Sequence, residues 1–439
     1  MTDLKASDDT VFDTNAQVVV IGAGACGLTA ALAAHDAGAE VLVLERDKTP
    51  AGSTALSSGF IPAANTRLQM EQGITDTPEK FANDIQLKAK GKAVPELVSL
   101  AAEHVGPALE WLSRSHGLEW VVLDDFLYPG HSTHRMHAVP ERTGVGLMAR
   151  LQNAAESAGV PIATECHVTS LIEHEGRIIG VEVLRPDGVE RIACKALVLA
   201  CNGYGGNPKM VAQYIPEMKG ALYFGHTGNT GDAVLWGEHL GAQVKHLSGY
   251  QGHGSVAHPY GVLITWALMM EGGIQVNTEG MRFSNEHGGY SEQAVHVLAQ
   301  PDGIAWNIYD ERLHYLGMEF EDYRTAFELG AVIEAATPEE LARKCALPLS
   351  QLSSTLAESS TLAKSNQIDK FGRQFAGSKM LAAPFYAVRV TGALFHTQGG
   401  LMINDHARVM NEQGEVFVNL FAGGGAACGV SGPDVSGYL

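Results

Sequence analysis

The feature that most constrains this chain is an apolar segment that runs directly into three closely spaced glycines. Residues 17–21 read QVVVI, a β-branched, apolar sequence typical of a strand buried in a parallel sheet. Gly22, Gly24 and Gly27 follow at once, and residues 28–36 have helical character. The order predicts a strand, a tight turn and a helix. In such a unit Gly22 allows the turn, Gly24 lets a phosphate approach the backbone, and Gly27 lets the helix pack closely on the strand.

A second strand and an acidic residue complete this unit. Residues 40–44 read EVLVL and lead into Glu45, at the spacing typical of an acid that binds the hydroxyl pair of a ribose. The free N–H groups at the start of the helix would receive the phosphates of a dinucleotide. Ala23 and Cys26 lie in the same turn, where this ligand would pass. The sequence therefore predicts a Rossmann-like dinucleotide-binding domain, and the flanking strand and helix disfavour the alternative of a purely structural glycine turn.

A hydroxyl-rich segment decides which dinucleotide to expect. Residues 51–59 read AGSTALSSG, small side chains that suit the long pyrophosphate and ribityl chain of FAD. An enzyme that binds nicotinamide alone has no obvious use for this segment. We therefore expect FAD. The contacts that we expect from this part of the chain are Arg46, Ser53, Thr54, Ser58 and Gly59.

Composition excludes several classes of protein. At 439 residues the chain is too long for one compact core, and its formal net charge of −19 opposes binding to nucleic acid or to an anionic membrane surface. The six cysteines form no C-x-x-C pair, which excludes common zinc and thioredoxin motifs. The acidic start of the chain lacks the basic region of a secretory signal. We expect a soluble, cytoplasmic protein. Cys26 could have a thiol activated by the helix dipole, but we favour a small filler beside the cofactor.

The middle of the chain predicts a small sheet that returns to the main one. Residues 143–158 predict an amphipathic helix, and residues 337–365 predict a helical region that opens at Thr337 and breaks near Pro348. The strands expected between these helical regions form a β-meander that leads back to the parallel sheet. They are residues 168–174, 177–184, 189–193 and 196–200.

The loop after the last of these strands carries a family resemblance. Residues 200–207 read ACNGYGGN and resemble the A-T-G-G-F-G-G-N-like loop of flavoproteins of the fumarate reductase and succinate dehydrogenase superfamily. Further motifs similar to those of this family recur in the same order along nearly the whole chain. They are residues 230–232 (TGD), 272–277 (GGIQVN), 280–286 (GMRFSNE), 383–387 (APFYA), 396–401 (HTQGGL) and 420–425 (LFAGGG).

The resemblance implies an α/β fold. A Rossmann-like FAD-binding domain with a β-meander would comprise residues 1–236 and 382–439, and an α+β capping domain would comprise residues 237–381. Ser53 stands where the covalent flavoproteins of the superfamily have histidine, which implies non-covalent FAD. The further FAD contacts that the motifs imply are Val168, Ala200, Asn202, Gly203, Asp232 and Gly424.

The resemblance also suggests catalytic residues. Arg282 occupies the position that we assign to the family's proton donor, and an ion pair with Glu286 that merely anchors the loop is the alternative. His396 matches a histidine that binds a substrate carboxylate, and His253 matches a second family histidine. Either histidine could instead be structural. The tyrosines that could act as acid or base are Tyr250, Tyr260, Tyr290 and Tyr438, of which we select Tyr438.

Departures from the family pattern bear on the substrate. The family segment T-E-x-x-R reads TWALM here, so that Trp266 and Met269 replace its acid and arginine. The family arginine that clamps a second carboxylate is missing from residues 432–438, GPDVSGY. A pocket without these cations binds a dicarboxylate poorly. A larger, less charged substrate is expected, with the 3-ketosteroid dehydrogenases as the nearest chemical analogue. The family continues beyond the position of Leu439, so we also expect a truncated C-terminus.

The leading hypothesis is an FAD-dependent oxidoreductase that desaturates or reduces a C–C bond next to a carbonyl, by hydride transfer with flavin N5. The substrate would be a small molecule other than a small dicarboxylate, and the electron acceptor is open. The alternatives are a fumarate-type reductase of a small unsaturated acid, a flavin-binding protein without catalysis, and a nicotinamide-only enzyme. The spacing of His131, His134 and His137 resembles a metal site, but we favour a packed or surface loop and expect no metal.

Overall fold

A computed structural model describes residues 5–6, 10–124 and 127–437 of the chain. Within these residues the chain divides into two compact units. The first unit contains the described residues up to Ile215, together with Gly225–Tyr250 and those from His396 onward. The second unit contains Pro216–Phe224 and Gln251–Phe395. The chain therefore enters and leaves the second unit twice.

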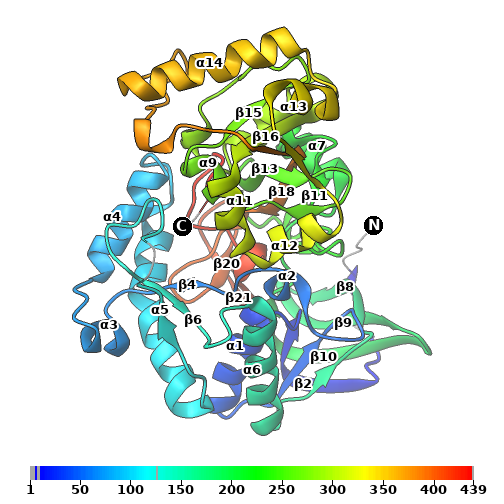
Figure 1. Ribbon diagram of the computed structural model, residues 1–439. Coiled ribbons are helices and arrows are strands. Elements are labelled where there is room, and N and C mark those ends of the chain that lie inside the picture. The colour runs from blue at the N-terminus through cyan, green and yellow to red at the C-terminus, as the bar shows by residue number, and fades with distance from the viewer. Residues whose placement is uncertain (1–4, 7–9, 125–126, 438–439) are drawn as a thin grey trace. The chain divides into compact units, whose positions relative to one another are not determined.

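One mixed sheet organises the first unit (Figure 1). Within the described residues it has nine strands, in the order β1-β8-β9-β10-β2-β3-β7, with β21 paired to β10 and β20 paired to β21. The strands are β1 (Lys5–Ala6), β2 (Thr14–Ile21), β3 (Val41–Leu44), β7 (Ile162–Ala163), β8 (His167–His174), β9 (Arg177–Arg185), β10 (Gly188–Leu199), β20 (Arg408–Met410) and β21 (Val416–Ala422). The strands from β10 to β7 run parallel, and β8, β9 and the first half of β10 form the antiparallel meander.

Strand β2 explains why its sequence is apolar without alternation. Val19 and Ile21 point into one hydrophobic cluster, while Val20 points into another on the opposite face of the sheet. Helices α1 (Ala25–Asp36) and α6 (Gly144–Ser157) cover the face of Val20, where Leu28 and Leu151 are also buried (Figure 1). A parallel strand covered on both faces needs apolar side chains at successive positions.

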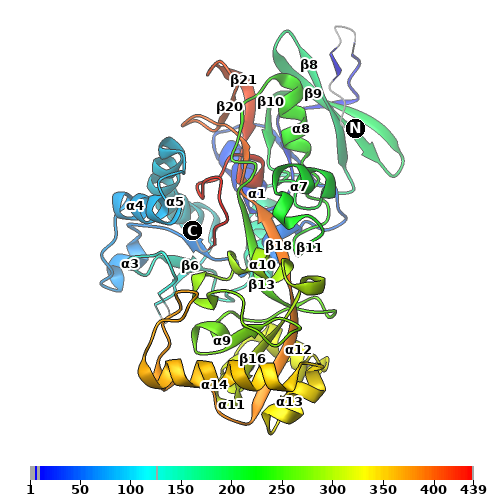
Figure 2. The same ribbon diagram turned by 90° about the horizontal axis from the view of Figure 1, so that it is seen from above.

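Strand β10 changes partners along its length. The sequence predicted two strands here, at 189–193 and 196–200, and the structure has one continuous strand, Gly188–Leu199. Its first half pairs antiparallel with β9, and its second half pairs parallel with β21 on that edge (Figure 2). The side chain of Asn419 bridges the change, since Nδ2 donates to the carbonyls of Ile178 and Lys195 at 2.7 and 2.8 Å. No break is needed because the opposite edge stays paired with β2.

The remaining elements of the first unit surround this sheet. Its helices are α1 (Ala25–Asp36), α2 (Gly52–Ala55), α3 (Arg67–Glu71), α4 (Pro78–Lys88), α5 (Pro95–His116), α6 (Gly144–Ser157), α7 (Pro208–Tyr214) and α8 (Asp232–Leu240). Two small sheets join β4 (Ile61–Pro62), β5 (Val121–Val122) and β6 (Met136–Ala138), and β12 (Val244–Lys245) with β19 (Gly400–Leu401).

The second unit is built around the long strand β18 (Phe385–Thr397), which pairs with β11, β16 and β17. Its other strands are β11 (Leu222–Tyr223), β13 (Tyr250–Ala257), β14 (Val262–Leu263), β15 (Ile274–Val276), β16 (Ile304–Asp310) and β17 (Val332–Ala335). Its helices are α9 (Ala267–Met270), α10 (Gln293–Leu298), α11 (Glu311–Met318), α12 (Glu321–Glu328), α13 (Pro338–Cys345) and α14 (Leu349–Ser365). Helix α14 runs beside α13 in both views (Figures 1 and 2).

The helical region at 337–365 follows its sequence signals closely. Thr337 caps α13, since its Oγ1 accepts the N–H of Glu340 at 3.3 Å, and Pro338 is the first helical residue. Pro348 separates α13 from α14. Within the described residues no helix is long and apolar enough to cross a membrane.

The borders of the compact units differ from the domain borders expected at 236/237 and 381/382. The second unit includes Pro216–Phe224 and residues 385–395 of β18, whereas residues 237–250 belong to the first unit. The reason is strand pairing: β11 and β18 hydrogen-bond to one another within the second sheet.

Candidate functional site

The first unit contains a cavity of about 380 Å³ at the carboxyl ends of β2, β3 and β10. Open α/β sheets bind their ligands at this end of the strands. Most of the predicted FAD contacts line the cavity. They are Gly22, Gly24, Cys26, Glu45, Arg46, Ser53, Thr54, Val168, Ala200, Asn202, Asp232 and Gly424. Segments far apart in the sequence thus converge on one site.

The glycine turn forms the floor of the cavity. Gly22 has a φ of +103°, and a Cβ there would lie 2.5 Å from the carbonyl oxygen of Ala200. A Cβ on Gly27 would lie 1.8 Å from the carbonyl oxygen of Gly22, so helix α1 can pack here only through glycine. Gly24 differs, because a Cβ there would meet only Thr54 Oγ1, at 3.5 Å. Gly22 and Gly27 are therefore required by the fold, whereas Gly24 leaves room for a ligand.

Five predicted contacts lie outside the cavity lining. The amide of Ala23 donates to Glu45 Oε2 at 2.9 Å and so holds the turn against the end of β3. Gly27 lies beneath the turn, and Gly59 and Gly203 pack against Thr143 and Thr397. Ser58 is exposed. These residues, Ser58 apart, support the cavity from behind.

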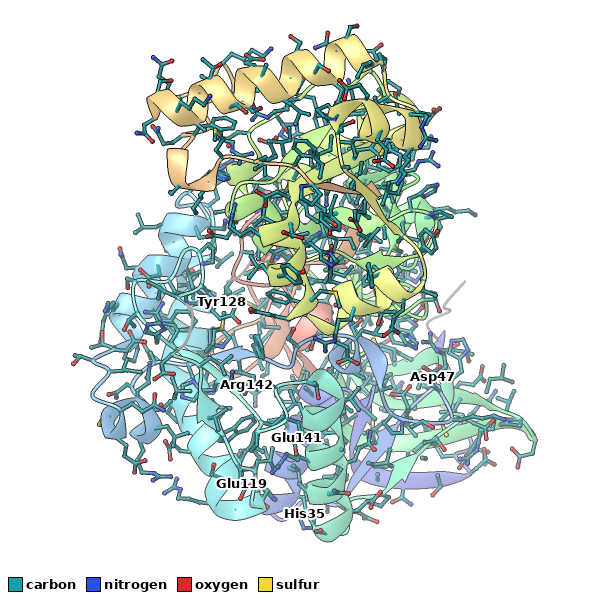
Figure 3. All side chains as sticks on the ribbon, viewed as in Figure 1. His35, Asp47, Glu119, Tyr128, Glu141 and Arg142 are labelled. Atoms are coloured by element: carbon teal, nitrogen blue, oxygen red, sulfur yellow. The ribbon has the colours of Figure 1, made fainter. Side chains whose placement is uncertain are left out.

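A segment that the sequence analysis did not select closes one side of the cavity. It comprises residues 226–229, and His226, Gly228 and Asn229 are part of the lining. Arg46 Nη1 donates to the carbonyl of Gly228 at 2.7 Å, and His226 Nε2 lies 2.8 Å from Asp47 Oδ2. Asp47, which Figure 3 labels, follows three residues after the end of β3 in the chain. The segment immediately precedes the T-G-D motif at 230–232, which is the signal that could have revealed it.

Two further contacts complete this side of the cavity. Asn229 Nδ2 donates to Ser53 Oγ at 2.8 Å, so the segment is tied to helix α2 as well as to Arg46 and Asp47. His167 and Trp236 also line the cavity and were not selected from the sequence. Neither residue belongs to a local sequence motif that would have predicted a contact with the cofactor.

The thiol of Cys26 is not activated. Burial raises its pKa to about 11, so the helix dipole does not produce a thiolate near neutral pH. Its Sγ would lie 2.7 Å from a Cβ on Gly423, which shows how closely the side chain fills the space beside that glycine. The geometry agrees with the filler interpretation rather than with the redox one.

Arg282, in the second unit, is enclosed by carboxylates. Its Nε and Nη2 donate to the two oxygens of Glu286 at 2.8 and 2.6 Å, and Nη1 donates to Asp369 at 2.6 Å. Arg373 Nη1 also lies 2.9 Å from Glu286. Burial alone would lower the pKa of Arg282, but the hydrogen bonds and charges of Glu286 and Asp369 outweigh it and raise the pKa. Burial alone would raise the pKa of Glu286, but the two arginines lower it to about 2.

His253 lies in a different neighbourhood of the second unit. Its ring stacks on Phe395, with centroids 5.3 Å apart, and packs against Tyr290 at 5.0 Å and the edge of Trp266 at 5.9 Å. Burial lowers its pKa to about 3. His253 and Arg282 share none of these side-chain partners, so the structure places them in one unit but not in one cluster.

Of the other two predicted catalytic residues, the structure describes His396, which belongs to the first unit. His396 is half-buried near the end of β18, its Nδ1 lies 3.4 Å from the carbonyl oxygen of Thr397, and burial lowers its pKa. Tyr438 lies outside the described residues. Of the other tyrosines considered, Tyr260 is exposed and donates to the carbonyl of Gly330, whereas Tyr290 contacts His253.

The histidine-rich loop is held by an arginine. Arg135 is fully buried and donates to Asp76 through Nε and Nη2 at 2.9 Å, and to Asp84 through Nη1. His131 Nδ1 lies 3.3 Å from Arg135 Nη1, and His137 Nε2 lies 2.8 Å from Thr66 Oγ1. Within residues 5–6, 10–124 and 127–437, no group of three or more His, Cys, Asp and Glu could hold a metal ion.

Comparison with known proteins bears on this cavity. The profile of a family described as an FAD binding domain matches residues 17–434. The chain belongs to this FAD-binding family. It is 30% identical over 422 residues to the probable fumarate reductase Ifc3 of Shewanella frigidimarina, covering 95% of this chain and 70% of that protein.

Solved structures agree with this assignment. A flavocytochrome c3 fumarate reductase in its open conformation superposes with a TM-score of 0.85 at 29% identity, covering 96% of this chain and 75% of the other. The 3-ketosteroid-Δ4-(5α)-dehydrogenase of Rhodococcus jostii RHA1 has a TM-score of 0.76 at 24% identity, covering 99% and 95%, and shares the fold. The resemblance to the fumarate reductase and succinate dehydrogenase flavoproteins and the α/β fold are confirmed.

FAD is therefore the cofactor of this chain, and the cavity fits it. Helix α1 begins at the carboxyl end of β2 with Gly24 as its N-cap, which has no side chain to cap it, and the amide of Ala25 donates to Thr54 Oγ1 at 3.2 Å. The open space above Gly24 suits a pyrophosphate, which a helix N-terminus stabilises. Glu45, Arg46 and Ser53 supply the polar groups around it.

Proposed function

We propose that the chain is an FAD-dependent oxidoreductase that desaturates or reduces a C–C bond next to a carbonyl, in a substrate other than a small dicarboxylate. The observation that carries the proposal is the state of Arg282. All of its N–H-bearing nitrogens donate to Glu286, Asp369 or the carbonyl of Ser284. A guanidinium committed in this way cannot also bind a substrate carboxylate in a bidentate pair.

The positions of the family's relay residues support the same conclusion. Trp266 and Met269, which replace the acid and the arginine of T-E-x-x-R, are buried and carry no charge. A dicarboxylate bound beside these side chains would lose its hydration without a free cation to compensate. This desolvation costs on the order of several kcal/mol per unpaired charge. An uncharged carbonyl compound meets no such cost.

Proton transfer is assigned to Tyr290 among the candidates. Its ring lies 5.0 Å from that of His253, and its hydroxyl is hydrogen-bonded to Gln251 Nε2. When bound, FAD supplies the hydride chemistry; Tyr290 would hold or take up the proton, and His253 and His396 would orient the substrate. Arg282 then has a positioning role, because its ion pairs fix residues 282–286 against residues 369–373.

We further propose that FAD is bound without a covalent link. Ser53 stands where the covalent flavoproteins of the superfamily have histidine, and its Oγ accepts a hydrogen bond from Asn229. Acid precipitation of the purified holoprotein should release the yellow flavin into the supernatant; a yellow pellet would contradict this. The electron acceptor and a cytoplasmic location stay predictions.

The decisive test is anaerobic. The purified yellow holoprotein is mixed with a panel of saturated ketones, steroids and carboxylates, and flavin absorbance is followed. Bleaching by a saturated ketone, or reoxidation of the reduced protein by the corresponding enone, would support the proposal. Failure of every carbonyl compound in both directions would overturn it.

A matched pair of variants tests the assignment of Tyr290. Tyr290→Phe should slow bleaching by about 10²–10⁴-fold, the usual contribution of a positioned acid or base, without loss of bound FAD. Tyr260→Phe is the control, since that side chain is exposed and its hydroxyl donates to the backbone carbonyl of Gly330. Equal rates for the two variants would remove Tyr290 from the proposal.

A fumarate-type reductase of a small unsaturated acid is the second candidate. It is favoured by the 30% identity to the probable fumarate reductase of Shewanella frigidimarina. Reoxidation of the reduced holoprotein by fumarate or acrylate, with no response to enones, would select this candidate. It would also require that Arg282 leave Asp369 or Glu286 when substrate binds.

A further inference from the structure

The segment 226–229 closes one side of the FAD cavity, and backbone groups fix one of its edges. The amide of Gly206 donates to the carbonyl of Asn229 at 2.9 Å. A Cβ on Gly206 would lie 2.5 Å from the carbonyl oxygen of Thr227, so backbone packs directly against backbone here. No rotation of a side chain can release such a contact. This edge of the segment is therefore fixed.

The segment is also held by three side chains that follow β3, those of Arg46, Asp47 and Ser53. Arg46 Nη1 donates to the carbonyl of Gly228 at 2.7 Å, and His226 Nε2 lies 2.8 Å from Asp47 Oδ2. Ser53 Oγ accepts the amide N–H of His226 at 3.4 Å. In contrast to the backbone edge, each of these bonds is released when one side chain changes its rotamer.

His226 makes its bond to Asp47 as a neutral ring. The amide N–H of Gly228 donates to His226 Nδ1 at 3.2 Å, so Nδ1 offers its lone pair and the N–H of the ring is at Nε2. The side chains of His226 and Asp47 are 26% and 36% exposed. Water can replace either partner, so opening this bond leaves no buried polar group unsatisfied.

These bonds join two walls of the cavity. Arg46, Asp47 and Ser53 line it from one segment, and residues 226, 228 and 229 line it from the other. FAD is a long ligand that is expected to extend from the glycine turn past Glu45. It can pass between the joined walls only while the bonds between them are open.

We propose that segment 226–229 opens and closes over FAD, and that its side-chain bonds to residues 46–53 set the rates at which FAD enters and leaves. The edge at Gly206 stays in place, and the edge at Asp47 is released. Bonds that keep the segment closed in both the free and the loaded protein cancel from the binding equilibrium and change only the two rates. The inference concerns the cofactor and does not depend on the reaction proposed above.

The bond between Asp47 and His226 allows a test without turnover. Holoprotein loaded with radiolabelled FAD is chased with unlabelled FAD, which gives the release rate, and equilibrium dialysis gives the dissociation constant. The release rate divided by the dissociation constant is the entry rate. Asp47→Ala should raise both rates about 10-fold, the effect of losing one hydrogen bond to a charged group. The dissociation constant should stay within about threefold of that of the unaltered protein.

A direct contact between Asp47 and FAD would give a different result. Losing such a contact raises the release rate and leaves the entry rate nearly unchanged, as most substitutions in a binding site do. That result, or an unchanged release rate, would overturn the inference. Circular dichroism of each holoprotein establishes that it is folded. If Asp47→Ala does not accumulate as a folded holoprotein, His226→Ala removes the same bond and carries the same comparison.

Asp36→Ala is the matched control. Asp36 also lies beside a histidine of the first unit, with Oδ2 3.1 Å from His116 Nε2, and its side chain is 35% exposed. Neither residue is among those that line the cavity, so FAD should exchange as in the unaltered protein. Rates raised as much as in Asp47→Ala would indicate general loosening of the unit and would overturn the inference.

A double variant tests whether Asp47 and His226 act through one bond. Asp47→Ala combined with His226→Ala should exchange FAD no faster than either single variant, because each substitution already removes the same bond. Release rates that multiply in the double variant would show two independent roles and would contradict the proposed opening edge.

Discussion

The candidate sites of the two units are built in opposite ways. The cavity of the first unit is shaped by backbone: glycine turns, a helix N-terminus and short polar side chains such as Ser53 and Asn229. The ring cluster of the second unit is shaped by large side chains on separate elements, with the polar atoms of His253 fixed from behind. A cofactor shared by many enzymes can be held by backbone, whereas a substrate must be distinguished by side chains. The contrast predicts which substitutions harm folding, cofactor binding or substrate choice.

The largest effect is expected where two glycines of the same turn are compared. Gly27→Ala would place a methyl group 1.8 Å from a carbonyl oxygen, so α1 must move and the holoprotein should fail to accumulate. Gly24→Ala meets only Thr54 Oγ1 at 3.5 Å and should fold with a stability within about 1 kcal/mol of the unaltered protein. It should nevertheless bind FAD at least ~10-fold more weakly, because the methyl group occupies the phosphate approach.

Flavin fluorescence titration and thermal melting of the apoproteins measure these two effects separately. Tight FAD binding by Gly24→Ala would show that the turn does not approach the cofactor. Normal folding of Gly27→Ala would contradict the packing argument.

The next largest effect should come from the ion-pair cluster of the second unit. Glu286→Gln leaves Arg282 and Arg373 buried with less negative charge around them, and breaking a buried pair in this way costs about 3–5 kcal/mol. Urea unfolding of the variant should show this loss. As a control, Lys92→Ala removes a half-exposed pair with Asp434 and should cost less than about 1 kcal/mol. Similar losses for the two variants would show that the cluster is not a structural anchor.

A smaller, graded effect is expected from pH. The pKa of His253 is about 3 in the folded chain against an ordinary value of 6.5, so the unfolded chain binds the extra proton more readily. His253 therefore contributes its stability above about pH 6.5, and this is lost as pH falls toward 3, with a slope of at most about 1.4 kcal/mol per pH unit. The difference in unfolding free energy between the protein and His253→Phe should change across this window. A difference that stays constant with pH would mean that the ring is not buried as described.

The smallest effect concerns Cys26. Because burial raises its pKa to about 11, the folded holoprotein should leave this thiol unmodified by iodoacetamide at pH 8. Cys26→Ala should keep the reduction potential of the bound flavin and lower stability by only about 1 kcal/mol, the cost of a small buried cavity. Rapid labelling of Cys26 in the folded protein would restore the redox interpretation.

Sequence predicted the first unit better than the second for a physical reason. The turn at Gly22–Gly27, Glu45 and the T-G-D motif are local signals, because backbone conformation depends on neighbouring residues. Residues 226–229 were missed because their role depends on Arg46 and Ser53, which are distant in the chain. The state of Arg282 depends on Asp369 in the same way.

Local sequence patterns also could not predict which strands pair with one another. The composition of residues 189–200 suggested a break, and the structure has none because β10 stays paired with β2 from Ile192 to Leu199, across the point where its other partner changes. The borders of the compact units differ from the expected domain borders because β11 and β18, which are far apart in the sequence, pair with one another. The five-ring group at His253 depends on residues 224, 253, 266, 290 and 395, a spacing that leaves no periodic trace.

Strand β10 sets the alignment of the whole first sheet. Leu197 and Leu199 point into one cluster while Val198 packs toward the other, and the residues at 188–193 of the same strand are matched one to one with β9. A slip of one residue in the hairpin would exchange the two faces all the way to Ala200, whose carbonyl touches the glycine turn. An insertion between Arg185 and Gly188 changes only the hairpin loop, whereas one inside the strand shifts the floor of the cofactor site. The register of β9 with β10 in the meander therefore determines which face of the sheet each later residue of β10 points to, as far as the cofactor site.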